Sequence, residues 1–365
     1  MFWKSRILEL QKLSDQMVCA HVGKGRIAMK LKTLTALALG SIALLSATAA
    51  YAEPLKIAVS NSYIGNEWRV QMINFMNAYA TKSLADKVKL SVDNSGTDAQ
   101  KQIAVIADMI ASGVDAILIN PSSDTALDSV IEEACAQGIT VISFDGPVGA
   151  QCAYIVSVDF TEIGRIHAQW LADTLGGKGN VIINRGVSGF PADTNMNAGM
   201  TGVLANYPDI KVVGEVYGKW DNAVSQQELT KVLTANPNVD GILNQYGTYG
   251  ALQALLNLNR PLIAMSGQGE NGWRQAMLTY KDQGLKGVSA GDPAVIGAYA
   301  LKVAVEILEG NKPAERFVEA PVPTVTTDTL EIGKNVFPDL PPTLDADSEI
   351  PGADLGLTIE DGMAK

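Results

Sequence analysis

Cysteine and histidine are scarce in this chain of 365 residues, which contains three cysteines and two histidines. Beyond the amino-terminal region only Cys135, Cys152 and His167 remain. A structural zinc site needs four such ligands in short, paired spacings, and one histidine with two widely separated cysteines does not provide them. We therefore expect neither a metal site nor a bound cofactor.

A convincing catalytic pair is also missing. The sequence has no P-loop lysine motif, His167 falls inside an expected helix, and no serine or cysteine has an obvious base partner. We expect His167 to be a helix residue without a function. These absences favour a protein that is not an enzyme, with an exported hydrolase as the enzyme alternative.

Long apolar runs are absent apart from one near the amino terminus. From Met29, Lys30 and Lys32 precede an apolar stretch at 34–45, and an Ala-Tyr-Ala triplet ends at Ala52. A basic start, a short apolar run and an A-x-A site form the order of a secretory signal peptide. The run is also too short to span a bilayer comfortably, which argues against the alternative of a membrane anchor.

This signal gives the first division of the chain. We predict a cleaved signal peptide at residues 29–52, a mature protein that begins at Glu53, and a periplasmic location. Residues 1–28 fit neither the signal nor a fold, and we interpret them as an over-extended start before the real initiator, Met29.

An oxidising compartment changes what the remaining cysteines can do. Cys135 lies late in an expected helix and Cys152 in the loop after the next strand, so the two could meet and form a disulfide. Two unpaired thiols are the alternative.

Basic residues are too few to balance the acidic ones. Residues 53–365 hold 21 of the 28 Lys and Arg and 37 of the 39 Asp and Glu, which gives a net charge of −16. Such an excess repels nucleic acid and anionic lipid and keeps an exported protein soluble. We expect no nucleic-acid partner.

Strands and helices are expected to alternate along residues 53–310. The strand patterns are mostly apolar instead of alternating, as a parallel sheet covered on both faces requires. The expected strands are 55–60, 88–93, 116–120, 139–145, 153–159, 180–186, 211–217, 240–244 and 261–266. The expected helices are 67–82, 98–112, 123–137, 161–175, 222–235, 249–258 and two that begin near 192 and 271. Two successive sets of this kind predict two doubly wound α/β lobes.

Ligands of such folds bind just beyond the carboxyl ends of the strands. The segments at those positions are rich in Asn, Gln, Asp, Ser and Gly, with Trp68 and Trp220 among them. Amides and carboxylates suit the hydroxyl groups of a polyol, and an aromatic face suits the C–H side of a sugar ring. The set predicts a site for a neutral polyol.

Several of these segments resemble the ribose-type sugar-binding proteins of bacterial ABC transporters. They are KIAVSNSYIGNEW, AILINPSSDTAL, VISFDGP, SVDFTEIGRIHAQWLADTL and GDPAVIGAYALKVAVEILEG, in the order of that family. The resemblance implies the type I periplasmic binding protein fold, in which two parallel-sheet lobes close over one ligand and the chain crosses between them three times. We accordingly predict an N-terminal lobe at 53–158 plus 292–318 and a C-terminal lobe at 159–291. Residues 319–365 would form the hinge return and a Pro-rich tail that extends over the surface.

The resemblance also suggests ligand-binding residues, and this sequence departs from the family at several of them. Matching positions hold a polar residue, aromatics, an aspartate and an amide, namely Asn66, Trp68, Asp145, Trp220, Gln245 and Tyr246. The family's arginines are replaced by Gly146 and within the segment 191–195. Its late aspartate is replaced by Ser266, and its hinge glutamine by Gly291. Its second aromatic residue is replaced by Arg69. The candidates offered by these departures are Arg69, Asp193, Asn195, Gln268, Glu270 and Asp292.

The functional expectation is a monomeric solute-binding protein that delivers a monosaccharide or related polyol to an ABC transporter permease. A sensory receptor for chemotaxis or quorum signalling is the alternative on the same fold. The effector lobe of a transcription repressor is a further alternative, and the signal peptide in place of a helix-turn-helix argues against it. The departures at Arg69, Gly146 and Gly291 argue against ribose bound in the ribose pose.

Overall fold

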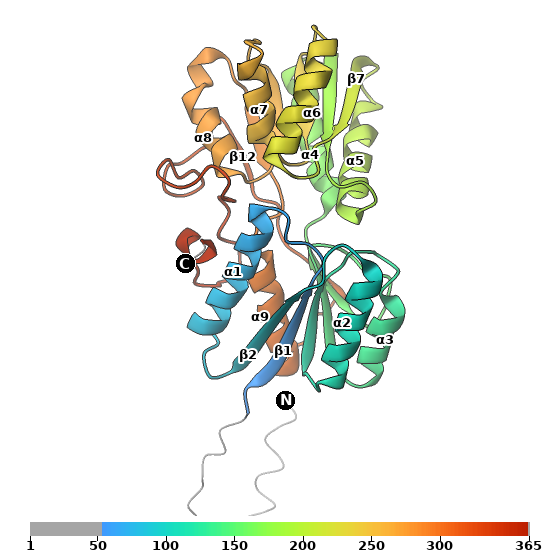
Figure 1. The fold of residues 1–365 in the computed structure, drawn as a ribbon. Coiled ribbons are helices and arrows are strands. Elements are labelled where there is room, and N and C mark those ends of the chain that lie inside the picture. Colours follow the sequence, from blue (N-terminus) through green and yellow to red (C-terminus); the bar gives the residue numbers. More distant parts are fainter. Residues whose placement is uncertain (1–52, 364–365) are drawn as a thin grey trace, which may run out of the picture. The chain divides into compact units, whose positions relative to one another are not determined.

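Two six-stranded sheets organise residues 53–363, the part of the chain that the computed structural model describes (Figure 1). The first sheet has the strand order β11-β5-β4-β3-β1-β2, and all of its neighbouring strands are parallel. These strands are β1 (Leu55–Asn61), β2 (Val88–Asn94), β3 (Ala116–Asn120), β4 (Thr140–Phe144), β5 (Tyr154–Ser157) and β11 (Phe317–Glu319). The expected signal peptide and the expected over-extended start lie outside the described residues.

The second sheet repeats this order, β12-β10-β9-β8-β6-β7, with a single antiparallel strand at its edge. Its strands are β6 (Lys178–Arg185), β7 (Asp209–Tyr217), β8 (Gly241–Asn244), β9 (Ala264–Gly267), β10 (Gly287–Ala290) and the antiparallel β12 (Thr324–Thr326). Two doubly wound sheets of this kind confirm the predicted α/β fold with two lobes.

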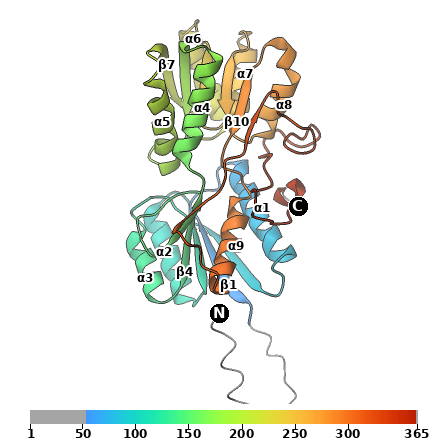
Figure 2. The same cartoon turned by 180° about the vertical axis from the view of Figure 1, so that it is seen from behind.

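Helices cover both faces of each sheet (Figures 1 and 2). On the first sheet α1 and α9 lie on one face and α2 and α3 on the other. On the second sheet α4 and α5 lie opposite α6, α7 and α8. The helices are α1 (Glu67–Lys82), α2 (Ala99–Ala111), α3 (Asp128–Ala136), α4 (Phe160–Thr174), α5 (Pro191–Leu204), α6 (Asn222–Ala235), α7 (Thr248–Asn257), α8 (Asn271–Thr279) and α9 (Ile296–Leu308), with short 3-10 helices η1 (Lys281–Gln283) and η2 (Ile359–Gly362).

One helix is shorter than its sequence predicts. A helix was expected over 123–137, but α3 begins only at Asp128. The Ser123 hydroxyl accepts hydrogen bonds from the amides of Thr125 and Ala126, so this serine orders a turn instead of capping a helix. The loop after β3 is therefore longer than predicted.

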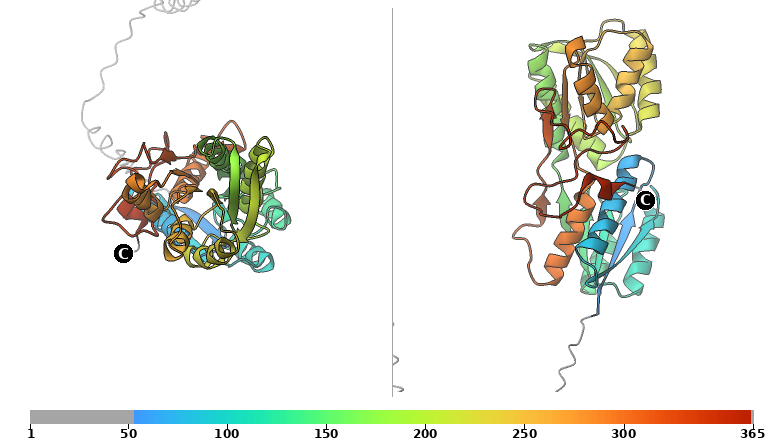
Figure 3. Two further views of the ribbon diagram at one scale, coloured as in Figure 1. Left: turned by 90° about the horizontal axis from the view of Figure 1, so that it is seen from above. Right: turned by 90° about the vertical axis from the view of Figure 1, so that its left-hand side faces the viewer.

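The carboxyl-terminal segment, residues 319–365, contacts both lobes, and its Pro-rich part at 337–356 contains no helix or strand. It supplies β12 to the second sheet and η2 to the surface of α1, and several of its apolar side chains are buried. Between these two elements the chain pairs with Gly269 in the second lobe and then returns to the first lobe (Figure 3). Three crossings join the lobes at 157–160, 290–296 and 319–324, and this return adds a fourth.

A disulfide joins Cys135 at the end of α3 to Cys152 in the loop before β5. The same loop is held by Arg316, whose guanidinium donates hydrogen bonds to the carbonyls of Val148, Ala150 and Ala153.

None of the helices within residues 53–363 is both long enough and apolar enough to cross a membrane.

Candidate functional site

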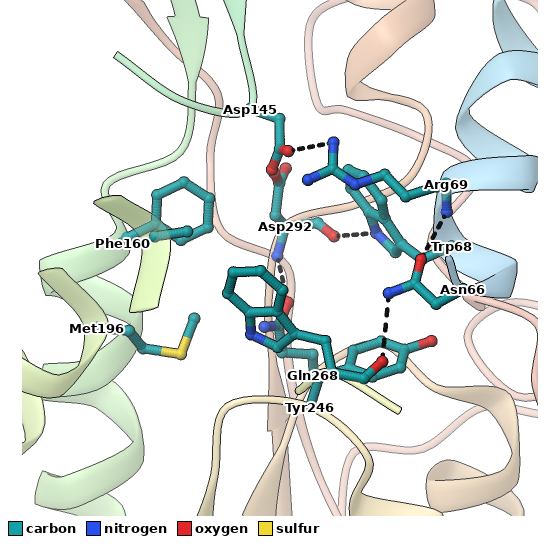
Figure 4. Close-up of a pocket in the computed structure, with 11 residues that line it drawn as sticks. Asn66, Trp68, Arg69, Asp145, Phe160, Met196, Tyr246, Gln268 and Asp292 are labelled. Atoms are coloured by element: carbon teal, nitrogen blue, oxygen red, sulfur yellow. Dashed lines mark hydrogen bonds and ion pairs between the residues drawn. The ribbon is translucent and has the colours of Figure 1, made fainter. Parts of the chain in front are cut away.

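A cavity of about 50 Å³ lies between the two lobes, at the carboxyl ends of their strands (Figure 4). Eleven residues from loops and helix starts line it: Asn66, Trp68, Arg69, Asp145, Phe160, Ala192, Met196, Trp220, Tyr246, Gln268 and Asp292. Eight of the twelve residues suggested by sequence as ligand-binding are in this set. The strand-end rule therefore identifies the location of the cavity.

The start of α1 brings three of these residues to the cavity. Asn66 is the N-cap of α1, and its Oδ1 accepts a hydrogen bond from the Arg69 amide at 3.1 Å. Its Nδ2 donates across the lobes to the carbonyl of Trp220 at 3.2 Å. The Trp68 indole donates to the carbonyl of Asp292 at 2.9 Å, in the crossing between the lobes. The helix start is thus tied to the opposite lobe and to the hinge.

Arg69 and Asp145 form a buried ion pair, with Nη1 and Oδ2 2.7 Å apart. Asp145 follows β4 with φ at 59°, a left-handed conformation that is uncommon for a residue with a side chain. The Asn120 amide donates to Asp145 Oδ2 at 2.7 Å and is itself held by the Ser62 hydroxyl. Asn120 thus fixes the orientation of the carboxylate, and the Arg69 guanidinium also lies 5.0 Å from the Trp68 ring centroid.

Asp292 is the least satisfied polar residue of the cavity. Its backbone amide donates to Gln268 Oε1 at 3.2 Å, but neither of its carboxylate oxygens has a hydrogen-bond partner among the described residues apart from the facing carboxyl of Asp145. The residue is only 2% exposed. Burial, and then the negative charge of Asp145, raise the pKa of Asp292 well above its ordinary value. The Arg69 charge opposes this shift.

Trp220 reaches the cavity from a strained turn before α6. Both Lys219 and Trp220 have φ at 56°, and the indole packs edge-on against Phe190 with the ring centroids 5.7 Å apart. A Cβ at Gly186 would lie 2.0 Å from the indole ring. This glycine therefore makes room for Trp220.

Four residues suggested by sequence do not line the cavity: Asp193, Asn195, Gln245 and Glu270. Asp193 is buried in an ion pair with Arg185, and the Gln245 side chain bridges the Gly186 amide and the Asp193 carbonyl. On α5 the cavity-lining residues are Ala192 and Met196, which are four apart and so share one helix face. Asp193 and Asn195 lie to either side of that face.

Sequence reasoning missed the apolar wall made by Phe160, Ala192 and Met196, because it searched strand ends for polar side chains. The tight crossing of α4 and α5 positions this wall. A Cβ at Gly164 of α4 would lie 2.0 Å from the Met196 carbonyl, and Gly199 approaches α4 equally closely. Paired small residues at the crossing were the signal that could have revealed it.

Other candidates have structural partners. Glu270 is buried outside the cavity, where its carboxylate accepts hydrogen bonds from Asn222 Nδ2 and the Thr248 amide. Ser266 is a buried residue of β9 in the second sheet, and its hydroxyl accepts a hydrogen bond from the Asn244 backbone amide. His167 is fully buried, and its Nε2 lies 2.7 Å from the Ala290 carbonyl. Desolvation lowers the pKa of His167 to about 4, so the ring is neutral near pH 7.

Two short glycine patterns lie around β9 and β10. Residues 267–272 match G-x-G-x-x-G before α8, and residues 287–291 match G-x-S-x-G. The structure gives the first a packing role, because a Cβ at Gly269 or Gly272 would meet the carboxyl-terminal segment. Ser289 of the second is buried, donates to the Gln268 carbonyl and accepts from Arg274 Nε, so it has no free hydroxyl for catalysis.

The comparisons with known proteins agree with this geometry. The family model described as a periplasmic binding protein domain matches residues 57–312, which contain both sheets up to the end of α9. The chain belongs to this family.

Similar proteins support the same assignment for this periplasmic binding protein. It is 29% identical to a xylitol-binding protein of Mycolicibacterium smegmatis, over 70% of this chain and 73% of the relative. It is 26% identical to the ribose import binding protein of Bacillus subtilis, over 73% of this chain and 85% of the relative. A crystal structure of an ABC transporter solute binding protein from Thermobispora bispora is 32% identical, has a TM-score of 0.66 and covers 73% of this chain and 84% of its own. The family and these neighbours are binding proteins and not enzymes.

Proposed function

We propose that this protein captures a monosaccharide or related polyol in the periplasm and delivers it to the permease of an ABC transporter. The observation that carries the proposal is the cavity between the lobes, in which two tryptophans lie beside the buried Arg69, Asp145 and Asp292. The names of similar proteins, which include ribose-, xylose- and xylitol-binding proteins, support the same ligand class.

The lining chemistry suits a neutral ligand that carries several hydroxyl groups. Asp145, Asp292 and Gln268 can accept or donate paired hydrogen bonds, while Trp68 and Trp220 provide apolar faces. A cavity of about 50 Å³ holds several water molecules and is smaller than a typical ligand pocket, so a polyol would have to displace this water and widen the space between the lobes. An epimer of the ligand would leave buried polar groups without hydrogen-bond partners, and each such group would reduce the binding free energy by about 1–3 kcal/mol.

Closure of the lobes would report the bound ligand to the membrane partner. Asn66 and Trp220 already join the two lobes by a hydrogen bond at the edge of the cavity. A ligand that contacts both sides stabilises this closed arrangement, and the permease would bind the surfaces that closure brings together.

A thermal-shift screen of purified protein tests the ligand class. The panel contains sugars, sugar alcohols and sugar acids, with amino acids and amides as the contrasting set. A polyol at about 100 times its Kd should stabilise the native state by about 2.7 kcal/mol. The proposal fails if amino acids or amides raise the melting temperature and no polyol does.

Tryptophan variants locate the binding event. Trp68→Ala and Trp220→Ala should each abolish the polyol shift, because they remove the apolar faces of the cavity. Trp170→Ala on α4 is the matched control, since Trp170 packs against the core and does not line the cavity. This control should melt earlier than the native protein and still respond to the polyol.

Delivery is tested with the transporter. The liganded protein should stimulate ATP hydrolysis by the permease complex encoded nearest to it, and the ligand should be recovered chemically unchanged. Stimulation of a sensor kinase in place of a transporter would support the receptor alternative, and conversion of the sugar would show an enzyme.

A further inference from the structure

The carboxyl groups of Asp145 and Asp292 face one another inside the cavity (Figure 4). An ionised carboxylate only accepts hydrogen bonds, so two ionised groups at this separation repel each other and cannot pair. A hydrogen bond forms between them only if one carries a proton. The surroundings of the two carboxyl groups decide which of them carries the proton.

Asp145 has partners that favour its ionised form. It forms the ion pair with Arg69 and accepts a hydrogen bond from the Asn120 amide. Asp292 has no such partner, because its carboxylate oxygens receive no N–H donor from the described residues. The proton therefore belongs on Asp292.

We propose that Asp292 is a protonated acid that donates a hydrogen bond to Asp145, and that this proton makes the cavity selective for an uncharged polyol. This inference rests on the proposed ligand class. With the proton in place, Arg69 and Asp145 balance each other and the three groups carry no net charge. Without the Asp292 proton, the cavity holds one unbalanced negative charge. A neutral ligand would displace the water that solvates this charge without neutralising it, which costs binding free energy.

Apart from Arg69, the other ionisable groups around Asp292 either favour its protonated form or are themselves neutral. Asp345 of the carboxyl-terminal segment adds negative potential, and only Arg69 opposes it. Tyr246 lines the same cavity, and burial raises its pKa well above the ordinary value, so it stays a phenol. Burial and the charge of Asp145 raise the pKa of Asp292, which agrees with the geometric assignment.

Affinity should consequently depend on pH with a defined sign. The form of the protein that binds carries the Asp292 proton, so above the pKa of Asp292 binding must take up a proton from solution. The Kd then rises about tenfold for each pH unit beyond that point. Below it, the Kd is independent of this group.

The experiment measures Kd by titration calorimetry between about pH 5 and pH 9, with xylitol, D-ribose and D-xylose as probes. The native protein should lose affinity only above the pKa of Asp292, and there it should take up one proton per ligand, measured in buffers of different ionisation enthalpy. Asp292→Asn cannot ionise, so its Kd should change less than twofold over the range and fall below the native Kd at the alkaline end. Asp328→Asn is the control, because Asp328 is an exposed carboxylate on the surface of the second lobe, and it should keep the native pH profile.

An infrared measurement separates this inference from the proposed function. The native protein without ligand should show the C=O stretch of the protonated Asp292 carboxyl as a band that appears in the native-minus-Asp292→Asn difference spectrum and is absent from the native-minus-Asp328→Asn difference spectrum. If none of the three probes binds, the infrared band still decides the protonation of Asp292. A native-minus-variant spectrum without this band, or an alkaline loss of affinity that persists in Asp292→Asn, would overturn the inference.

Discussion

At the scale of single residues, the cavity depends on a glycine that touches no ligand. Gly186 lies against the Trp220 indole, and its φ is outside the left-handed range, so its backbone tolerates a side chain. We predict that Gly186→Ala displaces the indole and weakens polyol binding at least tenfold, with about 1–3 kcal/mol lost from overpacking. Titration calorimetry and urea unfolding measure the two effects.

A second glycine provides the control for this prediction. Gly202 lies on the exposed side of α5, and a Cβ there would meet no atom within 4 Å. Gly202→Ala should leave affinity unchanged and stabilise the fold by up to about 1 kcal/mol, since alanine favours a helix interior. Equal affinities in both variants would show that the position of Trp220 does not matter for binding.

The sequence predicted the polar part of the cavity better than the apolar part. Asp145 could be found because it directly follows β4, and Asp292 lies two residues after β10, at the strand ends where the topology of parallel sheets places ligands. Met196 could not be found this way, because it lies inside a helix and its direction depends on how closely α5 packs on α4. Asp193 was suggested from the resemblance alone, and a one-residue change of helix position turns a side chain by about 100°.

At the scale of elements, strong local signals gave reliable bounds. The predicted α1 over 67–82 matches the structure because Asn66 caps its start, and β3 matches because AILIN is buried throughout. The predicted start of α3 at Ser123 was wrong. A serine can cap a helix or order a turn, and which of the two it does depends on the surrounding loop. Weak strands such as β11 and β12 have three residues each and depend on their neighbours for pairing.

The disulfide between Cys135 and Cys152 joins two elements of the first lobe, α3 and the loop before β5. The bond closes a loop of 17 residues and thereby lowers the entropy of the unfolded chain, which stabilises the folded state by about 3 kcal/mol. We predict that Cys135→Ser with Cys152→Ser lowers the free energy of unfolding by about 2–3 kcal/mol. Polyol affinity should change little, because Arg316 still holds the loop and Asn120 still orients Asp145.

Denaturant unfolding with and without a reducing agent checks the disulfide prediction. The reductant should lower the midpoint of the native protein to that of the double variant and leave the variant unaffected. Two reactive thiols in the unfolded, unreduced native protein would contradict the bond.

At the scale of the whole described chain, the carboxyl-terminal segment connects the two lobes near the cavity. Gln71 of α1 exchanges two hydrogen bonds with the Asp345 backbone, each 2.8 Å long. Two residues further, Asp347 accepts two hydrogen bonds from the guanidinium of Arg274 on α8. One short stretch of chain therefore holds a helix of each lobe, which a composition rich in proline could not indicate.

The ion pair that fixes this segment gives the last prediction. Arg274 is fully buried and lies near two buried carboxylates, Asp345 and Asp347. Burial and the charge of Asp347 raise the pKa of Asp345, and Arg274 opposes this shift. Removing the guanidinium leaves buried negative charge without a partner, so Arg274→Met should cost about 3–5 kcal/mol of unfolding free energy.

The pH dependence of Arg274→Met identifies the cause of this loss. A carboxyl whose pKa is raised in the folded state binds more protons than in the unfolded state, so stability falls as the pH rises above its ordinary value of 3.8. The loss should therefore be smaller near pH 4 than near pH 7, as measured by urea unfolding. Lys281→Met is the control, because its exposed pair with Asp328 contributes about 0–1 kcal/mol. A loss independent of pH would mean that Arg274 acts through packing, and an Arg274→Met protein as stable as the control would show that the segment does not hold the lobes.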